Sequence, residues 1–164
     1  MKKYTYTETK DTRSGFGEGL LEAARENENI VGLCADLTGS LKMNAFENEF
    51  PERFFQVGIS EANMMSMAAG MALSGLRPVI YTITPFTTVR CLEQIRIGVA
   101  YHEAPVVIVG TGSGLSYSEL GPTHHSLEDM IGETKEDGSI PPKIRYIDLR
   151  MGTKCQLACV MCSP

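Results

Sequence analysis

The sequence has no tryptophan, few aromatic residues and no long apolar run. Its apolar stretches fall well short of the roughly 20 residues that a membrane-spanning helix needs. A basic excess is also missing, because 15 lysines and arginines face 20 acidic residues. This charge disfavours nucleic acids and anionic membranes as partners. The N-terminal MKKYTYTETK has no apolar segment behind it, which predicts no secretory signal. We therefore expect a cytoplasmic protein that binds neither nucleic acid nor membranes.

The chain length and its alternating patterns predict a domain of the α/β class. A chain of 164 residues, 43% of them hydrophobic, suits one globular domain with a little extra. The patterns predict helices at about residues 12–26, 43–50, 60–74 and 87–102, and strands at 30–36, 54–58, 77–84 and 105–111. Strands that are solid apolar runs between helices are typical of parallel sheets. Over residues 1–131 we expect a doubly wound, mostly parallel sheet with helices on both faces.

Ligands of such sheets lie beyond the carboxyl ends of the strands. The residues that follow the predicted strands are therefore the candidates for a site: Asp36 to Ser40, Ser60 and Glu61, Thr84 to Phe86, and Thr111 to His125.

Glu61 is the first of these candidates, because it opens a helix directly after a strand. A carboxylate at this place commonly does no more than cap its helix. Its surroundings indicate more. QVGISEANMMSMAAGMALSG, which holds Glu61, resembles the glutamate segment of transketolases and deoxyxylulose-phosphate synthases, and the resemblance continues through PFTTVRCLEQIR and GPTHHSLED. The first 131 residues are thus similar to the pyrimidine-binding domain of a transketolase-type enzyme.

The resemblance implies thiamine diphosphate as the cofactor and a transfer of a two-carbon (ketol) or acyl unit. In that family the glutamate, here Glu61, hydrogen-bonds a ring nitrogen of the aminopyrimidine and so activates the thiazolium carbon. His124 would be the second catalytic residue, since the first histidine of GPTHHS reaches cofactor and substrate in the family. Phe86, Arg90 and Asp36 would join Glu61 in holding the cofactor.

Each of these side chains also has a structural interpretation: core packing for Phe86, a solvent-facing charge for Arg90, a turn for Asp36 and surface polarity for the histidines. Weaker parts of the resemblance assign substrate contacts to three further residues: Arg13, Ser40 and His125.

One position departs from the family pattern. Many transketolases carry an aspartate before GPTH, where it contacts a substrate hydroxyl, but the run SELGPTHH places Leu120 there. A leucine cannot accept that hydrogen bond. We therefore expect a keto compound other than the usual sugar phosphates as the donor.

The family's second cofactor motif, GDG followed by a distant asparagine, is missing. EDG at residues 136–138 has no asparagine after it. In the family that motif holds the diphosphate and a Mg²⁺ or Ca²⁺ ion. We therefore expect a diphosphate-binding transketolase subunit as the partner, in a homo- or hetero-oligomer that acts on a small keto or sugar substrate.

The last residues have a different character. The polar segment at residues 132–143, which contains glycine and proline, predicts a linker, and Cys155, Cys159 and Cys162 follow with the spacing C-x3-C-x2-C. This spacing predicts three ligands of a [4Fe–4S] cluster. RYIDLRMGTKCQLACVMCSP resembles the first strand and cysteine loop of radical S-adenosylmethionine enzymes, so residues 144–164 are interpreted as a truncated domain of that kind. The sequence ends two residues after Cys162, so no working radical enzyme is expected. An iron–sulfur protein fragment and an inactive fusion remnant are the alternatives for the whole chain.

Overall fold

The computed structural model describes residues 9–126. The linker predicted at 132–143, the domain start predicted at 144–164 and the three cysteines Cys155, Cys159 and Cys162 lie outside the described residues. Within residues 9–126 no helix combines the length and the apolar character that crossing a membrane would require.

The centre of the described part is a parallel four-stranded sheet with the order β2-β1-β3-β4. The strands are β1 (Ile30–Cys34), β2 (Phe54–Gln56), β3 (Arg77–Ile83) and β4 (Val107–Thr111). Apolar side chains continue from strand to strand, since Leu33 pairs with both Phe55 and Ile80, and Ile80 also pairs with Ile108. The predicted parallel α/β sheet is confirmed. After β2 the chain returns to the other side of β1, so the order reverses between β1 and β3, which is where open α/β sheets bind ligands.

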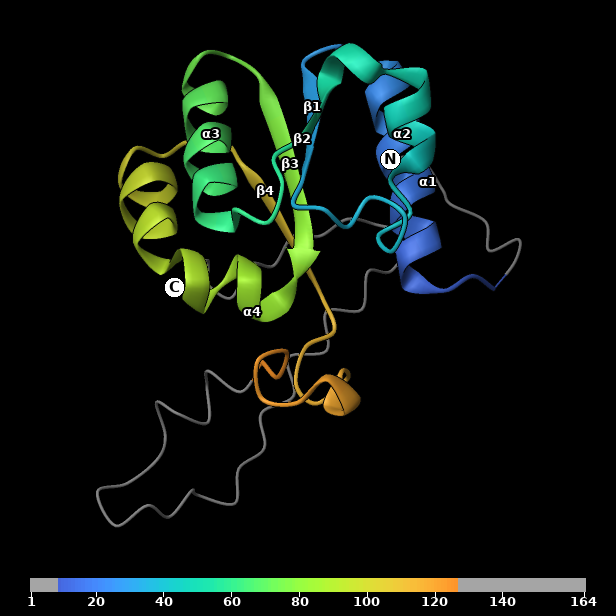
Figure 1. The fold of residues 1–164 in the computed structure, drawn as a ribbon. Helices are drawn as coiled ribbons and strands as arrows, with labels where there is room; N and C mark the ends of the chain where they lie inside the picture. Colours follow the sequence, from blue (N-terminus) through green and yellow to red (C-terminus); the bar gives the residue numbers. More distant parts are fainter. Residues whose placement is uncertain (1–8, 127–164) are drawn as a thin grey trace.

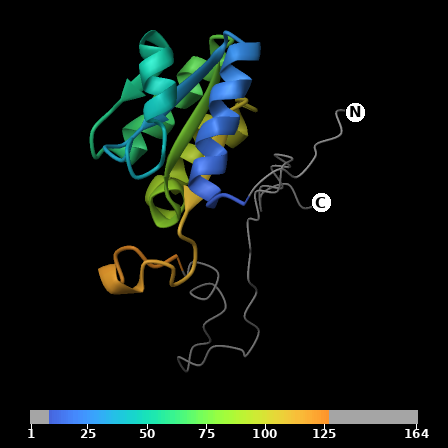
Figure 2. The same ribbon diagram turned by 90° about the vertical axis from the view of Figure 1, so that its right-hand side faces the viewer.

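Helices cover both faces of this sheet, as Figures 1 and 2 show. On one face lie α1 (Thr12–Glu26) and α2 (Asn44–Glu49); on the other lie α3 (Glu61–Leu73) and the π-helix η3 (Gln94–Tyr101). A short 3-10 turn, η1 (Pro51–Arg53), connects α2 to β2. Each helical layer buries its own cluster of apolar side chains against the sheet. The first includes Leu20 and Phe46, the second Met64 and Met65. Burial of apolar side chains on both faces of the sheet stabilises this doubly wound arrangement.

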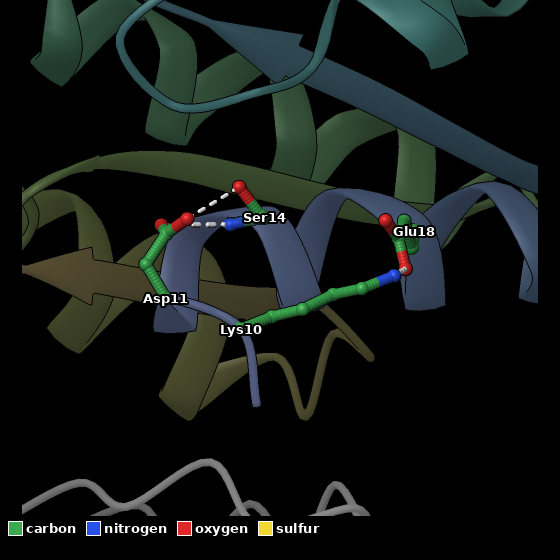
Figure 3. A network of polar contacts seen from close by, with 4 residues as sticks. All are labelled: Lys10, Asp11, Ser14 and Glu18. Carbon is green, nitrogen blue, oxygen red and sulfur yellow. Dashed lines mark hydrogen bonds and ion pairs between the residues drawn. The ribbon is translucent and has the colours of Figure 1, made fainter. Parts of the chain in front are cut away.

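Helix α1 begins at a well-formed polar cap, drawn in Figure 3. The side chain of Asp11 accepts hydrogen bonds from the backbone N–H of Ser14 at 3.1 Å and from its hydroxyl at 2.5 Å. These bonds hold the pKa of the Asp11 carboxyl below its ordinary value. Lys10 pairs with Glu18 at 2.6 Å across the first two turns. The helix predicted at about residues 12–26 is thereby confirmed, with Asp11 as its N-terminal cap.

The regular helix expected at residues 87–102 is wrong. The chain instead forms α4 (Thr84–Thr87), the 3-10 turn η2 (Val89–Cys91) and then η3. Pro85 starts the first turn early, because its fixed φ suits a helix N-terminus. Thr88 then leaves the helical region with φ −107° and ψ −95°, which separates α4 from η2. The break matters because it falls between two of the predicted cofactor-binding residues, Phe86 and Arg90.

Strand β4 also differs from expectation. The sequence predicts a buried strand there, yet β4 forms one edge of the four-stranded sheet, and only Val109 of its five residues is buried. An apolar run shows that a strand is suited to burial but does not show how many neighbours cover it.

Candidate functional site

Glu61 is a buried carboxylate at the carboxyl edge of the sheet. It is the first residue of α3 and only 4% exposed. Oε2 lies 3.0 Å from Nη1 of Arg90. Ser60, the residue before it, makes no capping hydrogen bond with its side chain. Because Glu61 is paired with a side chain from a different element, helix capping alone does not account for it.

Arg90 joins Glu61 to an aromatic ring. It lies in η2, and its guanidinium carbon is 3.9 Å from the centroid of the Phe86 ring. The guanidinium is planar, so it stacks on an aromatic face while its N–H groups still donate sideways. The Arg90 side chain is 43% exposed, whereas its carboxylate partner is buried. The interpretation of Arg90 as a solvent-facing charge is therefore incomplete, because its charged end is engaged twice.

Phe86 is presented by a turn that is fixed from several sides. Thr84 Oγ1 donates to the carbonyl of Thr111 at the end of β4, at 3.0 Å, and Thr87 Oγ1 donates to the Thr84 carbonyl at 2.9 Å. From η2 the Cys91 thiol donates to the Phe86 carbonyl at 3.0 Å. The ring itself is only partly buried. A half-buried ring on a rigid turn suits the stacking of a flat partner better than it suits core packing.

His124 meets the same ring from the loop after β4. Its ring centroid lies 5.2 Å from that of Phe86, edge to face, and 6.5 Å from that of Tyr117. Nδ1 of His124 is 2.9 Å from Thr123 Oγ1. The loop is closed by an antiparallel bridge between Gly114 and Ser126, with bonds of 3.1 and 2.9 Å. The structure thus brings His124, Phe86, Arg90 and Glu61 into one chain of contacts.

His125 takes a different position on this loop. Its Nε2 atom is buried and has no hydrogen-bond partner within residues 9–126. A buried polar atom without a partner is costly. It is therefore available to a group that these residues do not supply.

Asp36 does not join this chain of contacts. It is exposed, with φ +59°, and no hydrogen bond or ion pair within residues 9–126 connects it to Glu61. Its backbone N–H donates to Gln56 Oε1 at 2.6 Å, and Gln56 Nε2 donates to Thr38 Oγ1 at 3.0 Å. Gln56 Oε1 also accepts from Gly58 N–H at 3.2 Å. One glutamine thus fixes the loops after β1 and β2. It lies in the middle of the strand predicted at 54–58, so no local pattern in the sequence singled it out.

Arg13 and Ser40 come together although 27 residues separate them. Arg13 Nη1 donates to the Ser40 carbonyl at 3.3 Å, so the start of α1 meets the loop after β1. Nε of Arg13 also lies 3.9 Å from Oδ1 of Asp11. Their proximity agrees with a shared role, and the substrate contact itself stays a prediction.

Cys91 is a further residue of the candidate site, and the sequence alone did not single it out. It is fully buried, and burial, with a smaller contribution from the charge of Glu61, raises the pKa of its thiol to about 11. Burial likewise raises the pKa of Cys34 on β1. We expect both thiols of the native chain to resist alkylation at about pH 8, where a thiolate is the reacting species. The measurement is labelling by iodoacetamide before and after unfolding, with Cys155, Cys159 and Cys162 replaced by serine.

The same pKa shifts make stability depend on pH. At about pH 9 and above, the unfolded chain ionises Cys91 while the folded chain keeps it protonated. The contribution of the thiol is therefore complete below about pH 9 and is lost as the pH rises through about 11. Denaturant titrations across this window should show a falling free energy of unfolding. Rapid labelling of the native thiols would contradict both expectations.

Comparison with known proteins adds the family. Residues 8–131 match the model of the family described as "Transketolase, pyrimidine binding domain". A transketolase C-terminal section of Methanocaldococcus jannaschii is 43% identical over 121 residues, covering 74% of this chain and 38% of that protein. An apulose-4-phosphate transketolase subunit of Phocaeicola vulgatus is 37% identical over 118 residues, 72% of this chain and 38% of that protein. A solved "Split gene transketolase, inactive beta4 tetramer" superposes with a TM-score of 0.62 at 38% identity and covers 75% of this chain and 39% of its own. The chain therefore spans about two fifths of each of these relatives.

Proposed function

Because the chain belongs to the family of transketolase pyrimidine-binding domains, we propose that it supplies the cofactor-activating half of a thiamine-diphosphate active site. The reaction is the transfer of a two-carbon (ketol) or acyl unit. The other half, which holds the diphosphate and Mg²⁺ or Ca²⁺, comes from a partner subunit. We place the protein in the reducing cytoplasm, in accord with the free thiols of Cys34 and Cys91.

One observation carries the proposal: a buried carboxylate and a partly exposed aromatic face both engage the same flat N–H donor. Glu61 Oε2 is 3.0 Å from the Arg90 guanidinium, and that guanidinium stacks on Phe86 at 3.9 Å. A bound aminopyrimidine ring would need the same two partners: an aromatic face to stack on, and a carboxyl oxygen that hydrogen-bonds a ring nitrogen. The residues present therefore fit the pyrimidine end of the cofactor.

The roles of the residues follow from their chemistry. When bound, thiamine diphosphate supplies a thiazolium carbon that adds to the keto carbon of a substrate. Glu61 holds or shares a proton at the pyrimidine ring nitrogen, in a place that excludes water because the carboxylate is only 4% exposed. Phe86 fixes the plane of the ring. His124, against the edge of Phe86, moves a proton at the substrate end.

The partner and the substrate are finer parts of the proposal. Two of the relatives are named as a subunit or a split transketolase. These names support a separate diphosphate-binding chain. Leu120 is 55% exposed and offers no acceptor, which supports a keto donor other than the usual sugar phosphates. Arg13, Ser40 and His125 are proposed to contact that substrate, and Asp36 to border the cofactor from the loop after β1.

The C-terminal cysteines remain a separate proposal. The spacing of Cys155, Cys159 and Cys162 alone supports a [4Fe–4S] cluster on the last residues. The transketolase-type assignment of residues 8–131 does not depend on it.

Exchange of the cofactor's own proton tests the proposal without knowledge of the substrate. The chain is mixed with a transketolase subunit that carries the GDG motif, together with thiamine diphosphate and Mg²⁺ in D₂O. We expect loss of the thiazolium C2 proton, followed by proton NMR, to accelerate only when both chains are present. Equal acceleration by the partner alone would contradict the proposal, as would no acceleration by the mixture.

A further inference from the structure

We propose that Arg90 is a built-in substitute for the pyrimidine ring: in the cofactor-free chain its guanidinium occupies the place between Phe86 and Glu61 and must leave when the cofactor binds. The inference rests on the proposed function and deepens it. It assigns to Arg90 a competing role instead of the cofactor contact that sequence resemblance implies.

The geometry of the three side chains is the first step of the argument. A stacking distance of 3.9 Å between the guanidinium carbon and the Phe86 centroid leaves no room for a second planar group on that face of the ring. The same guanidinium donates toward Oε2 of Glu61 at 3.0 Å. A bound pyrimidine needs this aromatic face and this carboxylate at once. Arg90 and the cofactor therefore cannot hold these positions together.

Burial shows which of the groups can move. Glu61 is 4% exposed and Cys91 is completely buried, and the latter is bonded to the Phe86 carbonyl. The side chain of Arg90 is 43% exposed. Val89, which precedes it in η2, is 56% exposed, so this side of η2 faces solvent while Cys91 on the other side is buried. Arg90 can swing outward into water, whereas the other members of the site are held in place.

The position of Arg90 stabilises the cofactor-free chain. Without a cation, Glu61 would be a buried carboxylate with no charged partner, which is strongly unfavourable. Arg90 neutralises it and covers the ring until the cofactor arrives. The cost is affinity, because only molecules with an open site can bind, and the apparent dissociation constant rises in inverse proportion to that fraction.

Two substitutions test the inference in the complex with the diphosphate-binding subunit. For Arg90→Ala we expect thiamine diphosphate to bind about three- to tenfold more tightly in calorimetric titration, because the competitor is gone. The control is Arg96→Ala, since Arg96 is exposed and pairs with Glu93 in the neighbouring helix. It should leave the dissociation constant unchanged. Weaker or unchanged binding by Arg90→Ala would overturn the inference and restore Arg90 as a direct cofactor contact.

A second measurement needs no variant of Arg90 and so does not depend on its folding. In the cofactor-free wild-type chain the ring current of Phe86 should move the Arg90 Hδ and Hε resonances upfield, and Phe86→Leu should return them to ordinary values. Absence of this shift would overturn the inference. Neither result bears on the proposed function, which fails only if the complex does not accelerate exchange of the thiazolium proton.

Discussion

Glu61→Gln is expected to slow the exchange of the thiazolium C2 proton in the reconstituted complex by about 10²–10⁴-fold, the usual contribution of a positioned acid or base. The amide has nearly the shape of the carboxyl group and can still accept a hydrogen bond from Arg90. It cannot hold or share a proton at the pyrimidine ring nitrogen. The loss should therefore appear in the rate of exchange and much less in cofactor affinity.

Stability measurements separate this chemical effect from damage to the fold. Glu61 is paired with Arg90, and the glutamine carbonyl can replace the carboxylate oxygen at 3.0 Å. We expect the unfolding midpoint of Glu61→Gln to stay close to that of the wild type. Glu93→Gln is the control, because it makes the same change in an exposed ion pair, that of Glu93 with Arg96. An exchange rate of Glu61→Gln within a factor of about two of the wild type would remove Glu61 from the mechanism.

The regular elements of the fold were predictable because their buried faces produce periodic patterns of apolar residues in the sequence. The apolar runs that contain Leu33 and Ile80 gave their strands, and the small and methionine residues around Met64 gave α3. The break between α4 and η2 could not be predicted in this way. The turn before the break is held on β4 by a hydrogen bond from the Thr84 hydroxyl to the Thr111 carbonyl, a contact across 27 residues that no local periodicity contains.

In the site, too, some features could be predicted from the sequence and others could not. Resemblance to a family selected Glu61, Phe86 and His124, and the structure places them in one chain of contacts. What resemblance could not give is the state of the site, in which Arg90 fills the position of a ligand. Gln56 was missed because a polar residue at a strand end has no distinctive pattern. Its bonds to the loops after β1 and β2 exist only in three dimensions.

Gly110→Ala is expected to damage the scaffold of the site. A methyl group on Gly110 would lie 2.9 Å from Thr84 Oγ1, 3.0 Å from Thr87 Oγ1 and 3.1 Å from the Thr84 Cα atom. The hydroxyls are engaged in hydrogen bonds that seat the turn on β4, and the Cα atom belongs to the backbone. Nothing there can give way cheaply. We expect a loss of about 1–3 kcal/mol in the free energy of unfolding, and a larger loss for Gly110→Val.

A second glycine supplies the control for this prediction. Gly70 lies inside α3, and a methyl group there would meet nothing within 4 Å. Gly70→Ala should stabilise the chain by about 0.5–1 kcal/mol, as alanine does in helix interiors. Denaturant unfolding of both variants gives the comparison, and equal stability of Gly110→Ala and wild type would contradict the role of the turn. Because the turn that Gly110 supports also carries Phe86, the folded fraction of Gly110→Ala should bind thiamine diphosphate more weakly in the complex, whereas Gly70→Ala should bind it as the wild type does.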